Sequence, residues 1–142
     1  MNENAGEREA LELFERACEC DTAGLEAEAE PLYRAALATG MLDPYRQVRA
    51  TLQLASTLRL MGRLQESEAI LLRELDSRGE AGGDLHDEAR TLLALTWIEL
   101  GRGAEAAGLL LAVLAPKLSR YNRSMSRQAV RWTKRTWSPP VE

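Results

Sequence analysis

A five-position pattern recurs three times along the chain at nearly constant spacing. In each copy a small residue is followed seven residues later by glycine and twelve residues later by a second small residue. A large residue stands four positions after the second small residue, and a leucine four positions further on. The copies are Ala17, Gly24, Ala29, Tyr33, Leu37, then Ala55, Gly62, Ser67, Leu71, Leu75, then Ala94, Gly101, Ala106, Leu110, Leu114. The glycines are 38 and 39 residues apart, a period that indicates repeated helical hairpins.

Each position of the pattern has a physical reason. Small residues allow two helices to cross closely. Glycine ends the first helix, because it adopts positive φ without steric cost. The large residue and the leucine four positions later share one face of the second helix, where they fill the groove beneath the next repeat. One hairpin cannot bury its own apolar face, but several stacked hairpins can.

The residues that carry the pattern resemble the tetratricopeptide repeat. The resemblance is carried by Leu54, Ala55, Leu58, Gly62, Leu64, Ser67, Leu71 and Leu75, and again by Leu93, Ala94, Trp97, Gly101, Ala106, Leu110 and Leu114. More narrowly, residues 53–59 with Gly62-Arg63, and residues 120–124, resemble a group of small bacterial tetratricopeptide proteins of unknown function. This resemblance implies an all-α, right-handed superhelical solenoid that binds protein and forms a homodimer, with no known reaction. Arg16 and Cys20 depart from it, because large apolar residues are usual there.

The sequence predicts a single domain over residues 1–137, followed by a tail at 138–142. About three repeats lie near 7–40, 45–78 and 85–115, and a terminal helix at 118–136 caps them. The expected helices are Glu7–Cys20, Leu25–Ala38, Tyr45–Leu60, Leu64–Asp76, Leu85–Leu100, Ala104–Leu114 and Leu118–Thr136. Asp43 before Pro44 predicts a capped helix start, Asp84 is expected to cap the fifth helix, and Pro116 to start the last. Pro31 falls inside the second helix, where it either kinks the axis or marks a later start.

The chain offers little for catalysis or for metal binding. His86 is expected in an exposed first turn. Because it is the only histidine, no second histidine can complete a metal-binding pair. Cys18 and Cys20 stand two apart and point in opposite directions on a helix. Glu12, Glu15 and Glu19 are interpreted as a solvated helix face, and no serine has a histidine partner. We therefore expect no enzyme, no metal and no cofactor.

No apolar run approaches the roughly 20 residues of a membrane span, and the first residues do not resemble a secretory signal. The expected location is therefore the cytoplasm, with no membrane partner.

The first helix of each repeat is expected to line a concave partner-binding face. The predicted contact residues are Arg46, Arg49, Leu52, Gln53, Ser56, Arg59, Thr91, Leu95 and Ile98. Together with Arg63, the arginines could fork the carboxylates of a partner peptide. In the alternative interpretation, the arginines are solvated charges and the apolar residues of the set pack under the last helix.

Charge is unevenly distributed. Residues 1–30 carry ten acidic and two basic side chains, whereas residues 117–142 carry seven basic and one acidic. The last helix is expected to cap the solenoid by burying Met125, Ala129 and Trp132; contact with a second chain, nucleic acid or a membrane are alternatives. Opposite charge at the two ends suggests a two-fold homodimer. Its expected contacts are Leu11, Phe14, Arg127, Arg131 and Trp132.

The sequence thus predicts a scaffold or adaptor that binds a protein or peptide and self-associates. A regulatory or sensory peptide-binding module of a transcription system is the alternative. Nucleic-acid binding through the basic last helix ranks third, because the net charge of −4 argues against it.

Overall fold

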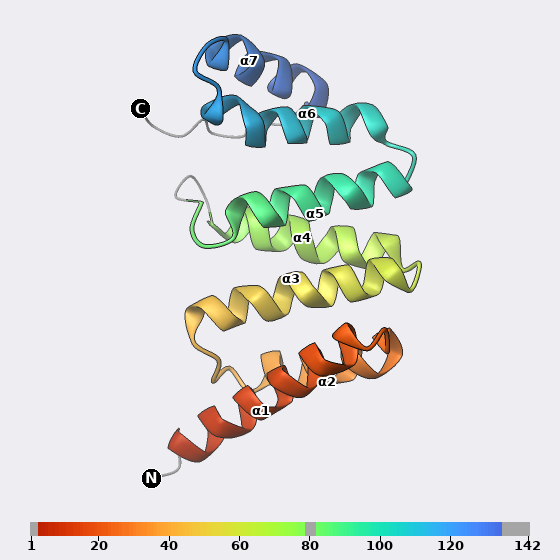
Figure 1. The fold of residues 1–142 in the computed structure, drawn as a ribbon, viewed down its shortest axis with the longest axis vertical. Helices are drawn as coiled ribbons and strands as arrows, with labels where there is room; N and C mark the ends of the chain where they lie inside the picture. The colour runs from red at the N-terminus through yellow and green to blue at the C-terminus, as the bar shows by residue number, and fades with distance from the viewer. Residues whose placement is uncertain (1–2, 79–81, 135–142) are drawn as a thin grey trace. The chain divides into compact units, whose positions relative to one another are not determined.

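The computed structural model describes residues 3–78 and 82–134, and over these residues it contains helices and no strand. The helices are α1 (Glu3–Thr22), α2 (Glu26–Ala38), α3 (Pro44–Leu60), α4 (Leu64–Arg78), α5 (His86–Glu99), α6 (Gly103–Leu114), the 3-10 helix η2 (Ala115–Lys117) and α7 (Asn122–Thr133) (Figure 1). The all-α helical-repeat fold expected from the sequence is confirmed. Its right-handed superhelical twist stays a prediction.

Three turns between paired helices are built in the same way. Gly24, Gly62 and Gly101 have φ of 73°, 78° and 78°. The amide after each glycine bonds the carbonyl five residues back: Leu25 to Cys20, Arg63 to Leu58 and Arg102 to Trp97, at 2.8–2.9 Å. The amide of each glycine bonds the carbonyl three residues back, at 2.9–3.0 Å. This pair of hydrogen bonds is the Schellman cap, which ends a helix and reverses the chain.

The small residues of the pattern lie where the paired helices are packed together. Ala17, Ala29, Ala55, Ser67, Ala94 and Ala106 are each at most 1% exposed. A longer side chain at such a buried position is expected to overpack the interior. The sequence prediction for these residues is therefore consistent with their burial.

The chain divides into two compact units, residues 1–71 and 72–142, with the boundary inside α4. The first unit has a core of Phe14, Ala17, Ala29, Tyr33, Ala36, Ala50, Leu54 and Leu58. Buried residues of the second unit are Leu75, Ala89, Leu93, Ala94, Trp97, Ala106, Leu109, Ala115 and Ala129. The predicted single domain over residues 1–137 stays a prediction, and the predicted tail at 138–142 lies outside the described residues.

Helix starts agree with the sequence prediction only in part. Asp43 caps α3 as expected, because its Oδ1 accepts a hydrogen bond of 3.0 Å from the amide of Arg46. Asp84 does not cap α5: the residue before the helix is Leu85, at φ 56°, and no side chain of the described residues caps the helix. The Asp84 carbonyl instead accepts a bond from Nη1 of Arg78. Helix α2 begins at Glu26 and runs through Pro31.

The last helix was placed wrongly. Pro116 lies in the 3-10 helix η2 rather than at the start of α7, which begins at Asn122. Tyr121, at φ 65°, interrupts the helical path because non-glycine residues seldom adopt this conformation. The end of the predicted last helix, residues 135–136, lies outside the described residues.

Three predictions about burial were also wrong. Leu110 and Leu114 were expected to be covered by the next element, but they are 38% and 49% exposed. Trp132 is 49% exposed, whereas Thr133 beside it is 3% exposed. His86 begins α5 and was expected to be exposed, but it is half-buried, and among the residues that the structure describes its Nδ1 has no hydrogen-bond partner. Burial and the charges of Arg90 and Arg78 lower the pKa of His86.

Candidate functional site

A cleft opens between α1 and α3 in the first unit. The two helices are tied together near the C-terminal end of α1, where the Thr57 hydroxyl donates to Oδ1 of Asp21 at 3.1 Å. Oδ2 of the same carboxylate accepts a bond of 2.9 Å from the Tyr33 hydroxyl on α2. From this tie α1 and α3 diverge toward their N-terminal ends (Figure 1).

Burial and the hydrogen bonds to Cys18 and Asp21 raise the pKa of Tyr33. Because the phenol remains protonated at all ordinary pH, it is a permanent donor that holds α1 on α2. The buried Tyr33 thereby links α1 to α2 beside the cleft.

Two neighbouring hollows make up the cleft. The larger, of about 410 Å³, is lined by Glu7, Leu11, Gly40, Met41, Leu42, Asp43 and Arg46. The second, of about 360 Å³, is lined by Phe14, Glu15, Cys18, Glu19, Arg46 and Arg49. The two hollows lie side by side, because Arg46 lines both.

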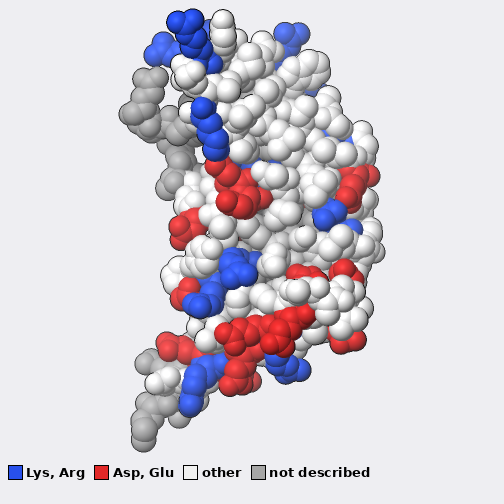
Figure 2. Space-filling model, viewed as in Figure 1, with Lys and Arg blue, Asp and Glu red and all other residues white. Residues whose placement is uncertain are grey.

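The two walls of the cleft carry opposite charge. Figure 2 shows acidic side chains gathered over α1 and basic side chains beside them over the first turns of α3. Within the residues described, Glu15 and Glu19 on α1 form no ion pair, and Arg49 on α3 forms neither an ion pair nor a hydrogen bond. The cleft thus presents acidic and basic side chains that remain able to form ion pairs with a ligand.

Arg49 is nevertheless held in place. Its guanidinium carbon lies 5.2 Å from the centre of the Phe14 ring, a geometry that favours cation–π attraction. Phe14 itself is 3% exposed and its ring centre lies 6.3 Å from that of Tyr33. A positioned arginine with free N–H groups can bind a carboxylate at less entropic cost than a mobile one.

Arg46 is anchored differently. Its Nη1 lies 2.8 Å from Oδ2 of Asp43. Hydrogen bonding to Asp43 and the carboxylates of Asp43 and Glu15 raise the pKa of Arg46. In return, hydrogen bonds from the side chain and the amide of Arg46 lower the pKa of Asp43. Because the Arg46 guanidinium has several donors, it can hold Asp43 and still meet a ligand.

The structure places the predicted contact residues unevenly. Arg46, Arg49, Gln53 and Ser56 follow one face of α3 at helical spacing; Arg46 is exposed and the other three are half-buried, as is Arg59. Leu52 is 4% exposed and so belongs to the interior rather than to an open surface. Thr91, Leu95 and Ile98 are exposed on α5, in the second unit.

The predicted dimer contacts are also divided. Phe14 is a core residue and Leu11 is half-buried against the same core, so the apolar bulk of α1 is used inside its own unit. Arg127 and Arg131 are exposed on α7, where the Arg131 guanidinium lies 6.0 Å from the centre of the Trp132 ring.

Sequence reasoning missed the acidic wall. Glu15, Cys18 and Glu19 were interpreted as solvated or packing residues, although their spacing of three and four places them on one face of α1. Each stands at a fixed offset from Ala17, as Gln53, Ser56 and Thr57 do from Ala55. Comparing repeats at equal offsets would have placed both sets on the same side of their helices.

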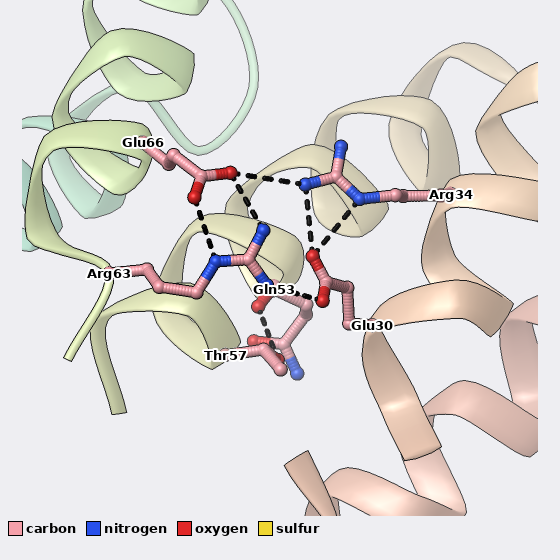
Figure 3. A network of polar contacts seen from close by, with 6 residues as sticks. All are labelled: Glu30, Arg34, Gln53, Thr57, Arg63 and Glu66. Atoms are coloured by element: carbon pink, nitrogen blue, oxygen red, sulfur yellow. Dashed lines mark hydrogen bonds and ion pairs between the residues drawn. The ribbon is translucent and has the colours of Figure 1, made fainter. Parts of the chain in front are cut away.

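Arg63 does not belong to the cleft. It forms an ion-pair network with Glu30, Arg34 and Glu66 that joins α2 to the start of α4 (Figure 3). Although burial opposes it, hydrogen bonds from Arg63 and Arg34 lower the pKa of Glu30. Since its guanidinium is bonded to Glu30 and Glu66, Arg63 is not available to fork a partner's carboxylates.

Metal-binding geometry is not found in residues 3–78 and 82–134, where no three histidine, cysteine or acidic side chains gather closely enough to hold an ion. In the same part of the chain, none of the helices combines the length and apolar character that crossing a membrane requires.

Helical hairpins that turn through Schellman caps at Gly24, Gly62 and Gly101 define a helical-repeat protein. A family model of the tetratricopeptide repeat matches residues 10–131, and the chain belongs to that family. Neither the curated proteins nor the solved structures contain a match.

Proposed function

We propose that the cleft between α1 and α3 binds a peptide segment of a partner protein. Membership of the tetratricopeptide repeat family indicates a protein–protein interaction module. One observation supports the cleft as the binding site. Arg49, stacked on Phe14, lies across the hollow from Glu15 and Glu19, and none of the three charges forms an ion pair within the residues described.

The chemistry of the two walls specifies the ligand. A segment that fits the cleft brings a carboxylate to Arg46 and Arg49 and a basic side chain to Glu15 and Glu19. Bonds from arginine to carboxylate are charge-assisted and directional. A segment of a single charge would satisfy one wall and be repelled by the other, so the two walls together select against uniformly acidic or basic peptides.

A peptide selection with the full chain tests this proposal. A random peptide library displayed on phage is selected on the immobilised protein, and the recovered peptides are measured by fluorescence anisotropy. We expect recovered sequences that combine acidic and basic residues. Arg49→Glu should weaken their binding at least tenfold, whereas Arg73→Glu, at an exposed arginine on α4 outside the cleft, should leave it unchanged.

Charge reversal of the other wall completes the test. Glu19→Lys should remove the preference for basic residues in the recovered peptides. Peptides that bind Arg49→Glu and Glu19→Lys as tightly as the wild type would place the binding surface elsewhere and refute the proposal.

Self-association is a second candidate function, and the charge distribution supports it. Helix α7 contains no acidic residue, and Arg127, Arg131 and the following Lys134 are exposed. On α1, Glu12, Glu15 and Glu19 are exposed and form no ion pair among the residues described. In a two-fold homodimer, α7 of each copy would face α1 of the other. Attraction between exposed charges raises the rate of association more than it stabilises the complex.

Sedimentation equilibrium at several salt concentrations measures this. We expect a dimer in low salt that Arg127→Glu with Arg131→Glu converts to monomer. A species of monomer mass for the wild type at tens of micromolar protein in low salt would exclude the homodimer.

A further inference from the structure

Helix α7 covers a different side of its neighbour than the repeat pattern predicts. A methyl group on Gly108 of α6 would lie 2.8 Å from Cβ of Trp132 and 3.0 Å from the amide nitrogen of Thr133, so this is the side that faces α7. Gly108 lies two residues after Ala106, as Pro31 lies two residues after Ala29, yet Pro31 is exposed. Helix α7 therefore covers the face of α6 whose equivalent on α2, the second helix of the first repeat, is exposed to solvent.

The first repeat shows what normally lies on the other side. Cys18 and Asp21 stand one and four residues after Ala17, and Tyr33 stands four residues after Ala29. The three are neighbours, because the Tyr33 hydroxyl lies 2.9 Å from Oδ2 of Asp21 and 3.7 Å from Sγ of Cys18. The following helix, α3, lies on this side and reaches Asp21 through Thr57.

The same three positions are uncovered in the third repeat. Leu95 and Ile98 stand one and four residues after Ala94, and Leu110 stands four residues after Ala106. They are 37%, 51% and 38% exposed, and Leu114, one turn beyond Leu110, is 49% exposed. By equivalence with the first repeat these side chains adjoin one another on the flank where a following helix would lie. We call them the open edge.

Few charges interrupt the open edge. The single charged residue of α6 is Glu105, which pairs with Arg102 at 2.9 Å, and Figure 2 shows a broad uncharged area over α6. An apolar patch of this kind on the last repeat is unusual, because terminal repeats normally present a polar outer face.

The exposed charges of α5 beside Leu95 are acidic, and the basic Lys117 beyond Leu114 pairs with Asp87 at 2.8 Å. Glu88 and Glu99 are exposed on the same side of α5 as Leu95. The one basic residue of α5 after the first-turn histidine, Arg90, is 7% exposed and pairs with Asp87. A partner that covers the open edge therefore meets leucine and isoleucine at the centre and the carboxylate of Glu88 on the α5 side.

We infer that the open edge binds an amphipathic helix of a partner protein, one whose apolar stripe is flanked by basic residues. The bound helix takes the place that α3 occupies on the first repeat. Anchors spaced three or four residues apart fit the row formed by Ile98, Leu110 and Leu114, and basic flanks match the exposed Glu88. The open edge shares no residue with the cleft between α1 and α3, so this inference does not depend on the function proposed above.

Two synthetic helical peptides with the same leucine stripe test the inference. One carries lysine and the other glutamate at the flanking positions, and each is titrated with the full chain by fluorescence anisotropy. We expect the lysine peptide to bind at least tenfold tighter than the glutamate peptide. The double variant Ile98→Asp, Leu110→Asp should lose at least tenfold in affinity, and Glu88→Lys should diminish the preference for lysine.

A matched control distinguishes binding at the open edge from non-specific binding to exposed leucine side chains. Leu60→Asp changes a leucine on α3 that is 56% exposed and should leave binding unchanged. Far-ultraviolet circular dichroism establishes that each variant is folded, which is expected because the altered side chains are exposed.

Several results would overturn the inference. These are equal binding of the two peptides, no binding of either, or unchanged affinity in the double variant. A wild-type dimer that the double variant converts to monomer would make a second copy the occupant of the open edge. Loss of lysine-peptide binding in Arg49→Glu would assign the peptide to the cleft instead.

Discussion

The packing of α7 against Gly108 gives a prediction that depends on a single methyl group. In Gly108→Ala the new Cβ would lie 2.8 Å from Cβ of Trp132 and 3.0 Å from both Cγ2 and the amide nitrogen of Thr133. Two of these atoms are fixed by the backbone of α7, so no side-chain rotation relieves the contact. Helix α7 must shift or α6 must bend.

The size of the effect follows from two opposing contributions. Alanine is about 1 kcal/mol more favourable than glycine in a helix interior. Overpacking a filled interior costs about 1–3 kcal/mol. The net change in Gly108→Ala is therefore a loss of stability between about zero and 2 kcal/mol, too close to zero to interpret without a reference.

Gly103→Ala supplies that reference. Gly103 begins the same helix, and a methyl group there would meet nothing within 4 Å. This variant receives the gain in helix propensity, up to about 1 kcal/mol at a first-turn position, without the clash. Gly108→Ala should therefore be about 1–3 kcal/mol less stable than Gly103→Ala.

Urea unfolding followed by circular dichroism measures the free energies of unfolding of the two variants. If Gly108→Ala unfolds at the same urea concentration as Gly103→Ala, α7 does not pack on that side of α6. The argument for the open edge would then lose its first step.

Four further predictions concern stability. Ala55→Leu at a fully buried crossing should lose about 1–3 kcal/mol by overpacking, whereas Ala27→Leu on the exposed face of α2 should be nearly neutral; equal thermal melts would place Ala55 outside the crossing. Gly62→Ala should lose about 1–2 kcal/mol, because φ there is 78° and this conformation strains a residue with a Cβ; wild-type unfolding free energy would contradict this. The pKa of His86 is lowered by folding, so its stabilising contribution is present above about pH 6.5 and is lost as the pH falls below that value; His86→Gln should flatten the pH dependence of unfolding there. The lowered pKa of Glu30 likewise predicts stability that is present above its usual value of 4.5 and lost as the pH falls through the lower folded value, and Glu30→Gln should remove this part of the acid sensitivity.

The hairpins could be predicted from the sequence because their determinants are local. Gly24, Gly62 and Gly101 adopt positive φ within a few residues of the carbonyls they bond. The Asp43 cap acts on an amide three residues away. Such features depend on residue type and spacing, and tertiary packing does not alter them.

The positions that were predicted wrongly depend on which neighbour covers a helix. Leu52 was assigned to an open face, yet it stands three residues before Ala55, as Phe14 stands three residues before Ala17. Both are buried, and the comparison of repeats at that offset would have indicated it. Asp84 failed as a cap because its carbonyl is held by Arg78, a contact that no local rule predicts.

The placement of α7 is the clearest limit of sequence reasoning. The pattern treats Leu110 and Leu114 as equivalent to Leu71 and Leu75, which are 0% and 5% exposed, and therefore expects the last helix to cover them. The glycine at position 108 instead lets α7 approach α6 from the other side. A missing side chain is a weak signal in a sequence, although it decides the packing here.

Side-chain types along the uncovered flank support a further step. Three residues before Ala94 stands Thr91, a polar residue where the earlier repeats have buried Phe14 and Leu52, and Thr91 is exposed. That substitution suits a flank in contact with water. Ile98 and Leu110 do not suit contact with water, because they are large apolar side chains on the same flank and are 51% and 38% exposed. If water were the permanent neighbour, polar residues would be as favourable there as Thr91 is, and solubility would favour them. The mixture is better explained by a flank whose rim is wet and whose centre is covered when a partner helix binds.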